Sequence, residues 1–248
     1  MKLLIPLLIL PLLTTGIAHA QPAKVPQTTF RVLYIDRPFT EEETKAIESG
    51  TATASVNLLF SSDAPDSKGK RTEVEIAVTR NQLSYPQVYF GSEPIVLKLA
   101  SDGGGYVTSI PVPQNGGDLL VILKSRQPGV LEGASSLLIV SGGQEFPPGN
   151  LCIVNVTGFQ LAFQTPENST IIQPNEKRVF APKKLRMNAV PLTISADVRP
   201  MPRVIFEGAV RLSDADRIMF VAYSPPGEAD VFKTDFFMLQ PALSPVTP

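Results

Sequence analysis

Apolar and polar residues alternate in short runs along most of this chain. Residues 74–78 read Val-Glu-Ile-Ala-Val, and residues 192–196 read Leu-Thr-Ile-Ser-Ala. A period of two is typical of a β-strand with one buried face and one solvated face. Clusters of Gly, Pro, Asn and Asp separate the runs, and these residues favour turns. The pattern therefore predicts an all-β protein built from many short strands.

The strands recur at regular intervals, which is typical of a β-sandwich or barrel. They are expected at residues 30–36, 54–60, 71–79, 87–90, 94–100, 118–125, 136–140, 151–157, 159–164, 177–181, 191–198, 203–210, 217–223 and 230–239. One segment, residues 40–49, has helical character instead. Thr40 followed three residues later by Glu43 matches a capping box, so we expect a short helix there.

The chain also contains a weak internal repeat. The matching segments are 94–99 with 191–196, 118–129 with 216–227, and 31–36 with 152–157. The alternation and Pro-Gly turns that any two sandwiches share are one explanation of this similarity. Duplication of a single domain is the other, and we favour it. The repeat then predicts tandem domains of similar topology.

The fold class that follows is all-β, with two tandem immunoglobulin-like β-sandwich domains at residues 25–141 and 146–241. Their boundary is expected in residues 141–149, Ser-Gly-Gly-Gln-Glu-Phe-Pro-Pro-Gly, because domain connections are rich in Gly and Pro. The alternative is a long hairpin loop inside one larger sandwich.

The first twenty residues have the three parts of a secretory signal peptide. Met1-Lys2 is a short positive region, residues 3–13 are mostly apolar, and Ala18-His19-Ala20 is a cleavage site. The apolar run is too short to span a membrane, and no later run approaches the required ~20 residues. We therefore expect export to the periplasm or the extracellular space. A buried N-terminal strand or helix is the alternative.

The composition of the chain limits the kinds of catalytic and metal sites that it can form. The chain has 248 residues, a formal net charge of −1, one His and one Cys. Cleavage would remove His19, which excludes Ser-His-Asp and Cys-His catalysis and every His-ligated metal. Cys152 lies in an apolar strand, where Cys is usually a small core residue. We expect no catalytic residue, metal or cofactor, and no nucleic-acid partner, which would favour a basic chain. Hydrolysis by two carboxylates stays as an alternative.

Three segments resemble a known group of proteins. They are Phe-Pro-Pro-Gly-Asn at 146–150, Asn-Val-Thr-Gly at 155–158 and Ile-Gln-Pro-Asn-Glu at 172–176. They are similar to turns in uncharacterised bacterial secreted proteins with tandem immunoglobulin-like domains. Asn175 stands where those proteins have Gly. The resemblance implies a sandwich fold and a location in the cell envelope.

A weaker similarity connects the chain with periplasmic pilus chaperones, which also have a signal peptide and two immunoglobulin-like domains. Those chaperones hold a subunit's C-terminal carboxylate with an Arg and a Lys in the interdomain cleft. The resemblance implies these roles for Arg31 and Lys124. The chain departs from the chaperones at Pro128-Gly129, which interrupts the region of the donated strand.

The leading functional hypothesis is an exported, non-catalytic structural or interaction protein. It would bind another envelope protein through a strand edge or the interdomain groove. A periplasmic pilus-type chaperone is one alternative, and a carbohydrate-binding module is the other. Because the chain has no Trp, its platform for a polysaccharide would be Tyr85 and Tyr89. The basic residues Lys183, Lys184 and Arg186 indicate either contact with a polyanion or a solvated loop.

Overall fold

The computed structural model describes residues 26–65, 69–101, 103–140, 145–198, 200–228 and 231–238. The predicted signal peptide, with His19, lies outside the described residues, as do residues 141–144 of the expected domain boundary. Within the described part, no helix is both long enough and apolar enough to cross a membrane.

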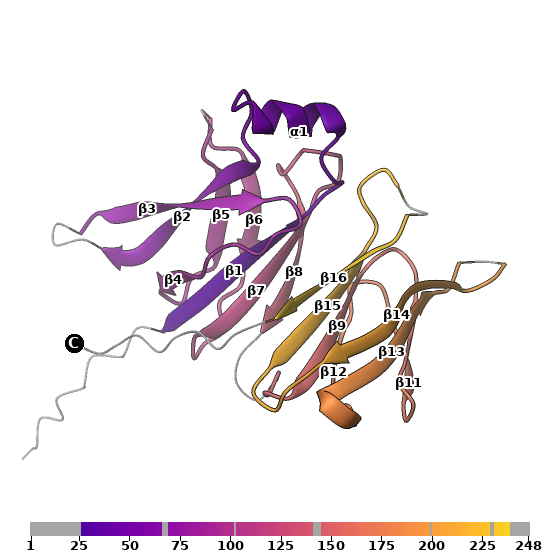
Figure 1. The fold of residues 1–248 in the computed structure, drawn as a ribbon. Helices are drawn as coiled ribbons and strands as arrows, with labels where there is room; N and C mark the ends of the chain where they lie inside the picture. The colour runs from indigo at the N-terminus through magenta and orange to yellow at the C-terminus, as the bar shows by residue number, and fades with distance from the viewer. Residues whose placement is uncertain are drawn as a thin grey trace, which may run out of the picture.

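The first half of the chain forms two four-stranded sheets packed face to face (Figure 1). One sheet has the order β4-β1-β7-β8, and the other has the order β3-β2-β5-β6. The strands are β1 (Gln27–Ile35), β2 (Ser55–Pro65), β3 (Arg71–Thr79), β4 (Gln87–Phe90), β5 (Ile95–Leu99), β6 (Tyr106–Ile110), β7 (Gly117–Lys124) and β8 (Ser135–Val140). Alternate side chains of both sheets meet in one core, in which Phe30 packs edge-on against Phe60.

The second half repeats this arrangement strand for strand. Its sheets have the orders β12-β9-β15-β16 and β11-β10-β13-β14. The strands are β9 (Asn150–Val156), β10 (Leu161–Gln164), β11 (Ser169–Ile172), β12 (Lys177–Phe180), β13 (Ala189–Ala196), β14 (Arg203–Arg211), β15 (Arg217–Tyr223) and β16 (Lys233–Met238). β9 pairs in parallel with β15, just as β1 pairs with β7. The predicted all-β class is confirmed, and the sheets form two sandwich-like pairs.

The structure corrects one of the segment matches of the sequence repeat, that of residues 118–129 with 216–227. Equal spacing matched Asp118 with Asp216. The core-facing residues of β7, such as Leu119, instead correspond to those of β15, such as Ile218. The two strands are therefore offset by one residue from the match by spacing. A shift of one residue turns every side chain to the other face of a sheet, so the buried faces decide the register.

Two strands were missing from the expectation, β6 and β11. β6 follows the glycine-rich turn after β5 and pairs with it as a hairpin. β11 has only Ile172 fully buried, so its four residues carry almost no alternation of apolar side chains. Short edge strands of this kind give a weak sequence signal.

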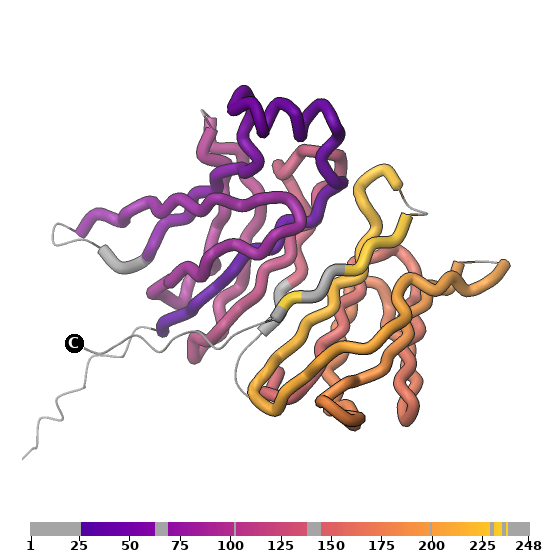
Figure 2. The backbone as a smooth tube through the Cα atoms, in the orientation of Figure 1, coloured from indigo at the N-terminus to yellow at the C-terminus, as the bar shows by residue number. Residues whose placement is uncertain are grey.

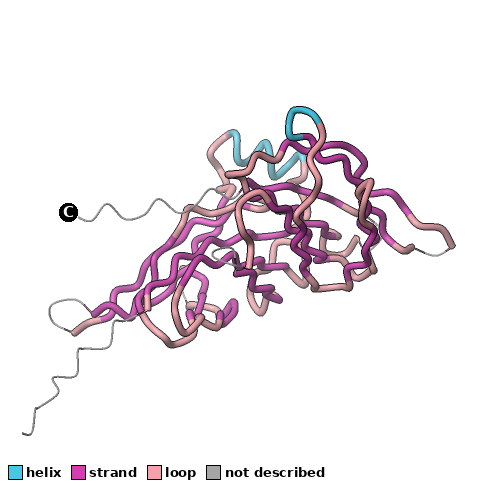
Figure 3. Tube along the Cα trace, turned by 90° about the horizontal axis from the view of Figure 1, so that it is seen from below, coloured by secondary structure: helices cyan, strands magenta, loops and turns pink. Residues whose placement is uncertain are grey.

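The short helix is confirmed as α1 (Glu41–Glu48). The Thr40 hydroxyl accepts a hydrogen bond from the Glu43 backbone N–H at 3.2 Å. The Glu43 carboxylate accepts one from the Thr40 N–H at 2.8 Å. This is the reciprocal capping box that the sequence predicted. The only other helical segment in the described chain is the 3-10 turn η1 (Arg186–Asn188), and Figure 3 shows both as short stretches among strands.

The two sandwiches also pack against each other, so four sheets are stacked (Figures 1 and 2). The outer faces of β1 and β7 contribute Leu33, Ile35, Leu120 and Ile122. The outer faces of β9 and β15 contribute Cys152, Val154, Met219 and Val221. Both faces of these four strands are therefore buried, which explains the unbroken apolar runs in β7 and β15. Burial raises the pKa of the Cys152 thiol to about 12, so a thiolate is strongly disfavoured.

Candidate functional site

A pocket of about 630 Å³ lies at one end of the contact between the two sandwiches. The first sandwich lines it with residues at the end of β7 and the start of β8. The second lines it with the turns after β9, β11 and β15. The lining residues are Lys124, Ser125, Arg126, Ser135, Val156, Thr157, Gly158, Phe159, Pro174, Asn175, Ser224, Pro225, Pro226 and Gly227.

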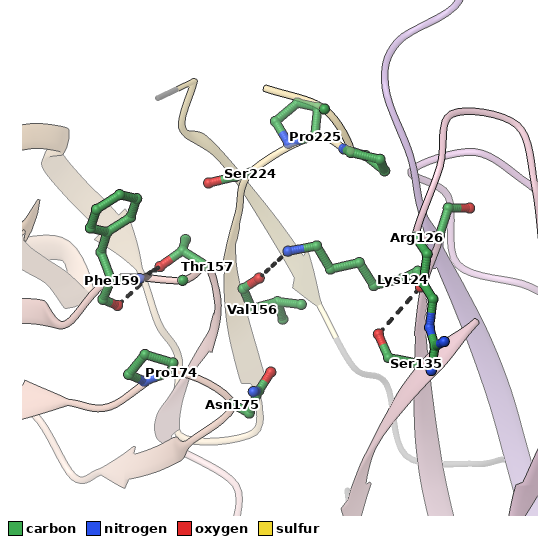
Figure 4. Close-up of a pocket in the computed structure, with 14 residues that line it drawn as sticks. Lys124, Arg126, Ser135, Val156, Thr157, Phe159, Pro174, Asn175, Ser224 and Pro225 are labelled. Carbon is green, nitrogen blue, oxygen red and sulfur yellow. Dashed lines mark hydrogen bonds between the residues drawn. The ribbon is translucent and has the colours of Figure 1, made fainter. Parts of the chain in front are cut away.

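Lys124 is the residue that joins the two walls of this pocket. Its side chain extends from the first sandwich, and Nζ donates a hydrogen bond of 2.8 Å to the Val156 carbonyl of the second (Figure 4). Burial lowers the pKa of Lys124, because the charged ammonium loses contact with water. The bond to a neutral carbonyl satisfies one ammonium proton, and no carboxylate of the described residues pairs with the charge.

The two charged residues that line the pocket are both positive. Lys124 and Arg126 are among its lining residues, and none of the fourteen is Asp or Glu. Opposite charges normally accompany a partly buried cation, because desolvation is otherwise costly. The arrangement therefore suits a negatively charged group on a ligand.

A second polar group in the lining is also incompletely bonded. The Ser224 hydroxyl oxygen is buried and has no hydrogen-bond partner within the described residues. Its counterpart in the first sandwich, Ser125, donates to the Tyr34 hydroxyl at 3.2 Å. Buried hydroxyls are usually satisfied, so an orphan in a pocket wall is a candidate contact for a ligand.

The backbone of its turn shows how Asn175 can occupy a position that suits Gly. Asn175 has φ 62°, in the left-handed region that Gly adopts without strain. Asn tolerates this conformation better than most residues. Its N–H donates to the Asn155 carbonyl at 2.8 Å, which ties the turn beside the pocket to β9.

Arg31 and Lys124 do not line the same pocket. Both lie on the face of their sheet that is turned toward the second sandwich. In the β1–β7 register, however, Arg31 is opposite Leu120, and Lys124 is opposite Ile35. Four positions separate them, or about 13 Å along the strands at about 3.3 Å per residue. Arg31 is also not among the residues that line the pocket with Lys124, so this pocket gives no support to the paired role implied by the chaperone resemblance.

Tyr85 and Tyr89 do not form an aromatic platform. Tyr85 is 87% exposed, but Tyr89 is only 2% exposed and belongs to the core of the first sandwich. The Tyr89 hydroxyl donates to the Glu93 carbonyl at 3.0 Å. The prediction that both rings face a sugar is therefore wrong, because the alternation of β4 turns Tyr89 inward.

The sequence analysis did not single out a buried polar cluster around Asp36. This carboxylate is fully buried and accepts hydrogen bonds from the Tyr34 hydroxyl at 2.6 Å and the Gly129 N–H at 2.8 Å. Arg80 pairs with it at 3.4 Å and also with Glu43 of α1 at 3.2 Å. Burial, together with the bond to Asp36, raises the pKa of Tyr34 to about 12. The cluster satisfies its own members and holds α1 against the sandwich, so we interpret it as structural.

The described residues contain no group of three or more His, Cys, Asp or Glu side chains that could hold a metal ion. Comparison of the chain with protein-family models gave no match, and comparison with curated proteins gave none either.

Proposed function

We propose that this protein is an exported, non-catalytic interaction protein, and that the pocket between its sandwiches receives a carboxylate-bearing segment of a protein partner. The observation that carries the proposal is the half-buried Lys124, which lies in a two-walled pocket with Arg126 and without any lining carboxylate. A ligand carboxylate would supply the missing negative charge and form a charge-assisted hydrogen bond.

The remaining walls of the pocket suit a peptide rather than a small ion. Phe159, Pro174 and Pro225 provide apolar surface, and the volume of about 630 Å³ exceeds the needs of one anion. β8 is the last strand of its sheet, and its first residue, Ser135, lines the pocket. An extended peptide could therefore pair with the edge of β8 that no other described strand occupies, while its carboxylate reaches Lys124.

Export rests on the signal-peptide pattern in residues 1–20. The absence of catalysis rests on the loss of the single His with that segment and on the buried, high-pKa Cys152. The carbohydrate alternative loses its main support, because Tyr89 lies in the core.

The proposal can be tested with an array of short peptides, each made with a free C-terminal carboxylate and as the C-terminal amide. We expect the protein to select a subset of the free acids and to bind the matching amides about tenfold more weakly or worse. In Lys124→Met, acid and amide should bind equally weakly. Lys98→Met is the matched control, because Lys98 is exposed on the outer face of β5.

Two results would contradict the proposal. One is equal binding of acids and amides by the wild-type protein, which would show that the C-terminal carboxylate is not recognised. The contradiction is complete if peptides with internal Asp or Glu also bind no better than their Asn or Gln counterparts. The other is Lys124→Met retaining wild-type binding while losing only thermal stability. Lys124 would then serve only to connect the sandwiches through Val156.

A further inference from the structure

The second sandwich carries an exposed turn in which two apolar side chains flank a cation. Leu185 is 53% exposed and Met187 is 74% exposed, and Arg186 between them is also exposed. We call residues 185–187 the apolar-basic tip. Single exposed apolar residues are common, but two at the end of one turn need an explanation.

The backbone holds the tip in a defined and unfavourable shape. Met187 has φ 61° and ψ 29°, and Asn188 has φ 56°, so two consecutive non-glycine residues are left-handed. Two hydrogen bonds hold this conformation, from the Leu185 N–H to the Ala189 carbonyl at 2.8 Å and from the Leu212 N–H to the Asn188 carbonyl at 2.9 Å. Strain of this kind persists only where the surrounding structure maintains it, and it is most frequent at functional sites.

The charges around the tip are mainly positive. Lys183 pairs with Glu167 at 2.6 Å, and Lys184 pairs with Asp214, so these two lysines anchor the base of the turn. Within the part of the chain that the structure describes, Arg186 has no ion pair. Neither does Arg211, which is exposed and lies opposite Ala189 in the β13–β14 register.

From these features we propose that the apolar-basic tip docks the protein on a membrane surface that contains anionic lipids. Leu185 and Met187 would enter the boundary between headgroups and acyl chains, and Arg186 and Arg211 would contact lipid phosphates. A protein partner fits less well, because specific protein interfaces bury about 1,200 Å² or more, far more than these few side chains offer.

The tip and the proposed peptide pocket lie at opposite ends of the second sandwich. Asn188, the residue after the tip, accepts a hydrogen bond from Leu212, which precedes β15. The pocket contains Ser224, which follows β15. A protein docked on a membrane by the tip would therefore keep the pocket open to a partner. The two proposals can fail independently.

The absence of Trp from the chain provides a direct test. Met187→Trp places a single fluorophore at the tip, and Met201→Trp places one at an exposed position on another loop. We expect the emission of the first variant to shift to shorter wavelength with vesicles of phosphatidylcholine and about one-third phosphatidylglycerol. Pure phosphatidylcholine should cause a smaller shift, and the second variant should show none.

Sedimentation with the same vesicles measures the affinity. The double variant Leu185→Ser, Met187→Ser should bind about tenfold more weakly or worse, and Arg186→Glu should also bind more weakly. The matched control is Met201→Ser, Val204→Ser, which removes two other exposed apolar side chains. The proposal is wrong if the wild-type protein does not sediment with anionic vesicles, if the control weakens binding equally, or if soluble polyglutamate binds the tip and the vesicles do not.

Discussion

Asp36 is fully buried and Lys124 is half-buried, and the two charged side chains have different surroundings. Asp36 accepts two backbone N–H groups and a tyrosine hydroxyl and pairs with Arg80. Among the residues that the structure describes, the Lys124 ammonium has one neutral carbonyl as its partner. A buried charge with full compensation contributes to a specific fold, whereas one without compensation lowers stability. This difference supports a structural role for Asp36 and a binding role for Lys124.

Glu43 shares Arg80 with Asp36, and its carboxylate makes the stability of the fold depend on pH. Hydrogen bonds from Arg37, and then from the Thr40 N–H, lower the pKa of Glu43 from 4.5 to about 2. Since the folded pKa is the lower one, the Glu43 carboxylate stabilises the fold above about pH 4.5. That contribution is lost as the pH falls toward 2. We expect Glu43→Gln to reduce the free energy of unfolding at pH 7 and to reduce it less at pH 3.

Denaturant unfolding at the two pH values measures this difference. Glu48→Gln, at the exposed end of α1, is the control and should change stability equally little at both pH values. An equal loss at pH 7 and pH 3 in Glu43→Gln would show that its ion pairs do not contribute.

At the scale of elements, turns and caps position the strands. The capping box of α1 and the Asn175 turn each use a residue suited to its local backbone conformation. The turn before β7 has a second constraint, because it lies close to the start of β1. Gly116 has φ 69°, and a Cβ added there would lie 2.0 Å from the Gln27 carbonyl oxygen at the start of β1. The parallel β1–β7 pair begins at this point.

Gly116→Ala should therefore destabilise the protein by more than about 2 kcal/mol, because strain adds to a clash with backbone. Gly104→Ala is the control, since Gly104 has φ 56° but no atom within 4 Å of the added Cβ. It should cost only about 1 kcal/mol. Thermal unfolding of both variants measures the difference. Equal losses would mean that the β1–β7 approach is looser than described.

At the scale of the whole molecule, the apolar contact between the sandwiches unites the two halves. Cys152 lies fully buried within it. The thiol therefore reports on separation of the sandwiches, since it is shielded by the contact rather than by either core alone. A charge placed in the contact should separate the halves and leave both cores folded.

We expect Leu120→Asp to increase the labelling rate of Cys152 by a thiol reagent about tenfold or more, because buried aspartate disfavours the contact. Far-UV circular dichroism should stay unchanged if only the contact opens. Val96→Asp, on the exposed side of β5, should label as slowly as wild type. If Leu120→Asp is folded and its thiol stays unreactive, the sandwiches do not separate as described.

The sequence by itself determined most of the strands and the short helix. Alternation and capping are local properties, and residues a few positions apart settle them. It also indicated the similarity of the two halves and pointed to Lys124. The edge strands β6 and β11 were missed, because the buried residues of β6 do not alternate regularly with exposed ones and β11 has one buried residue.

The tertiary structure alone decided which faces meet. It set the one-residue offset between β7 and β15, turned Tyr89 into the core, and separated Arg31 from Lys124 along the β1–β7 register. It also brought turns from both halves together into one pocket and left Leu185 and Met187 exposed. These outcomes depend on contacts between residues far apart in the chain, and local patterns carry no information about such distances.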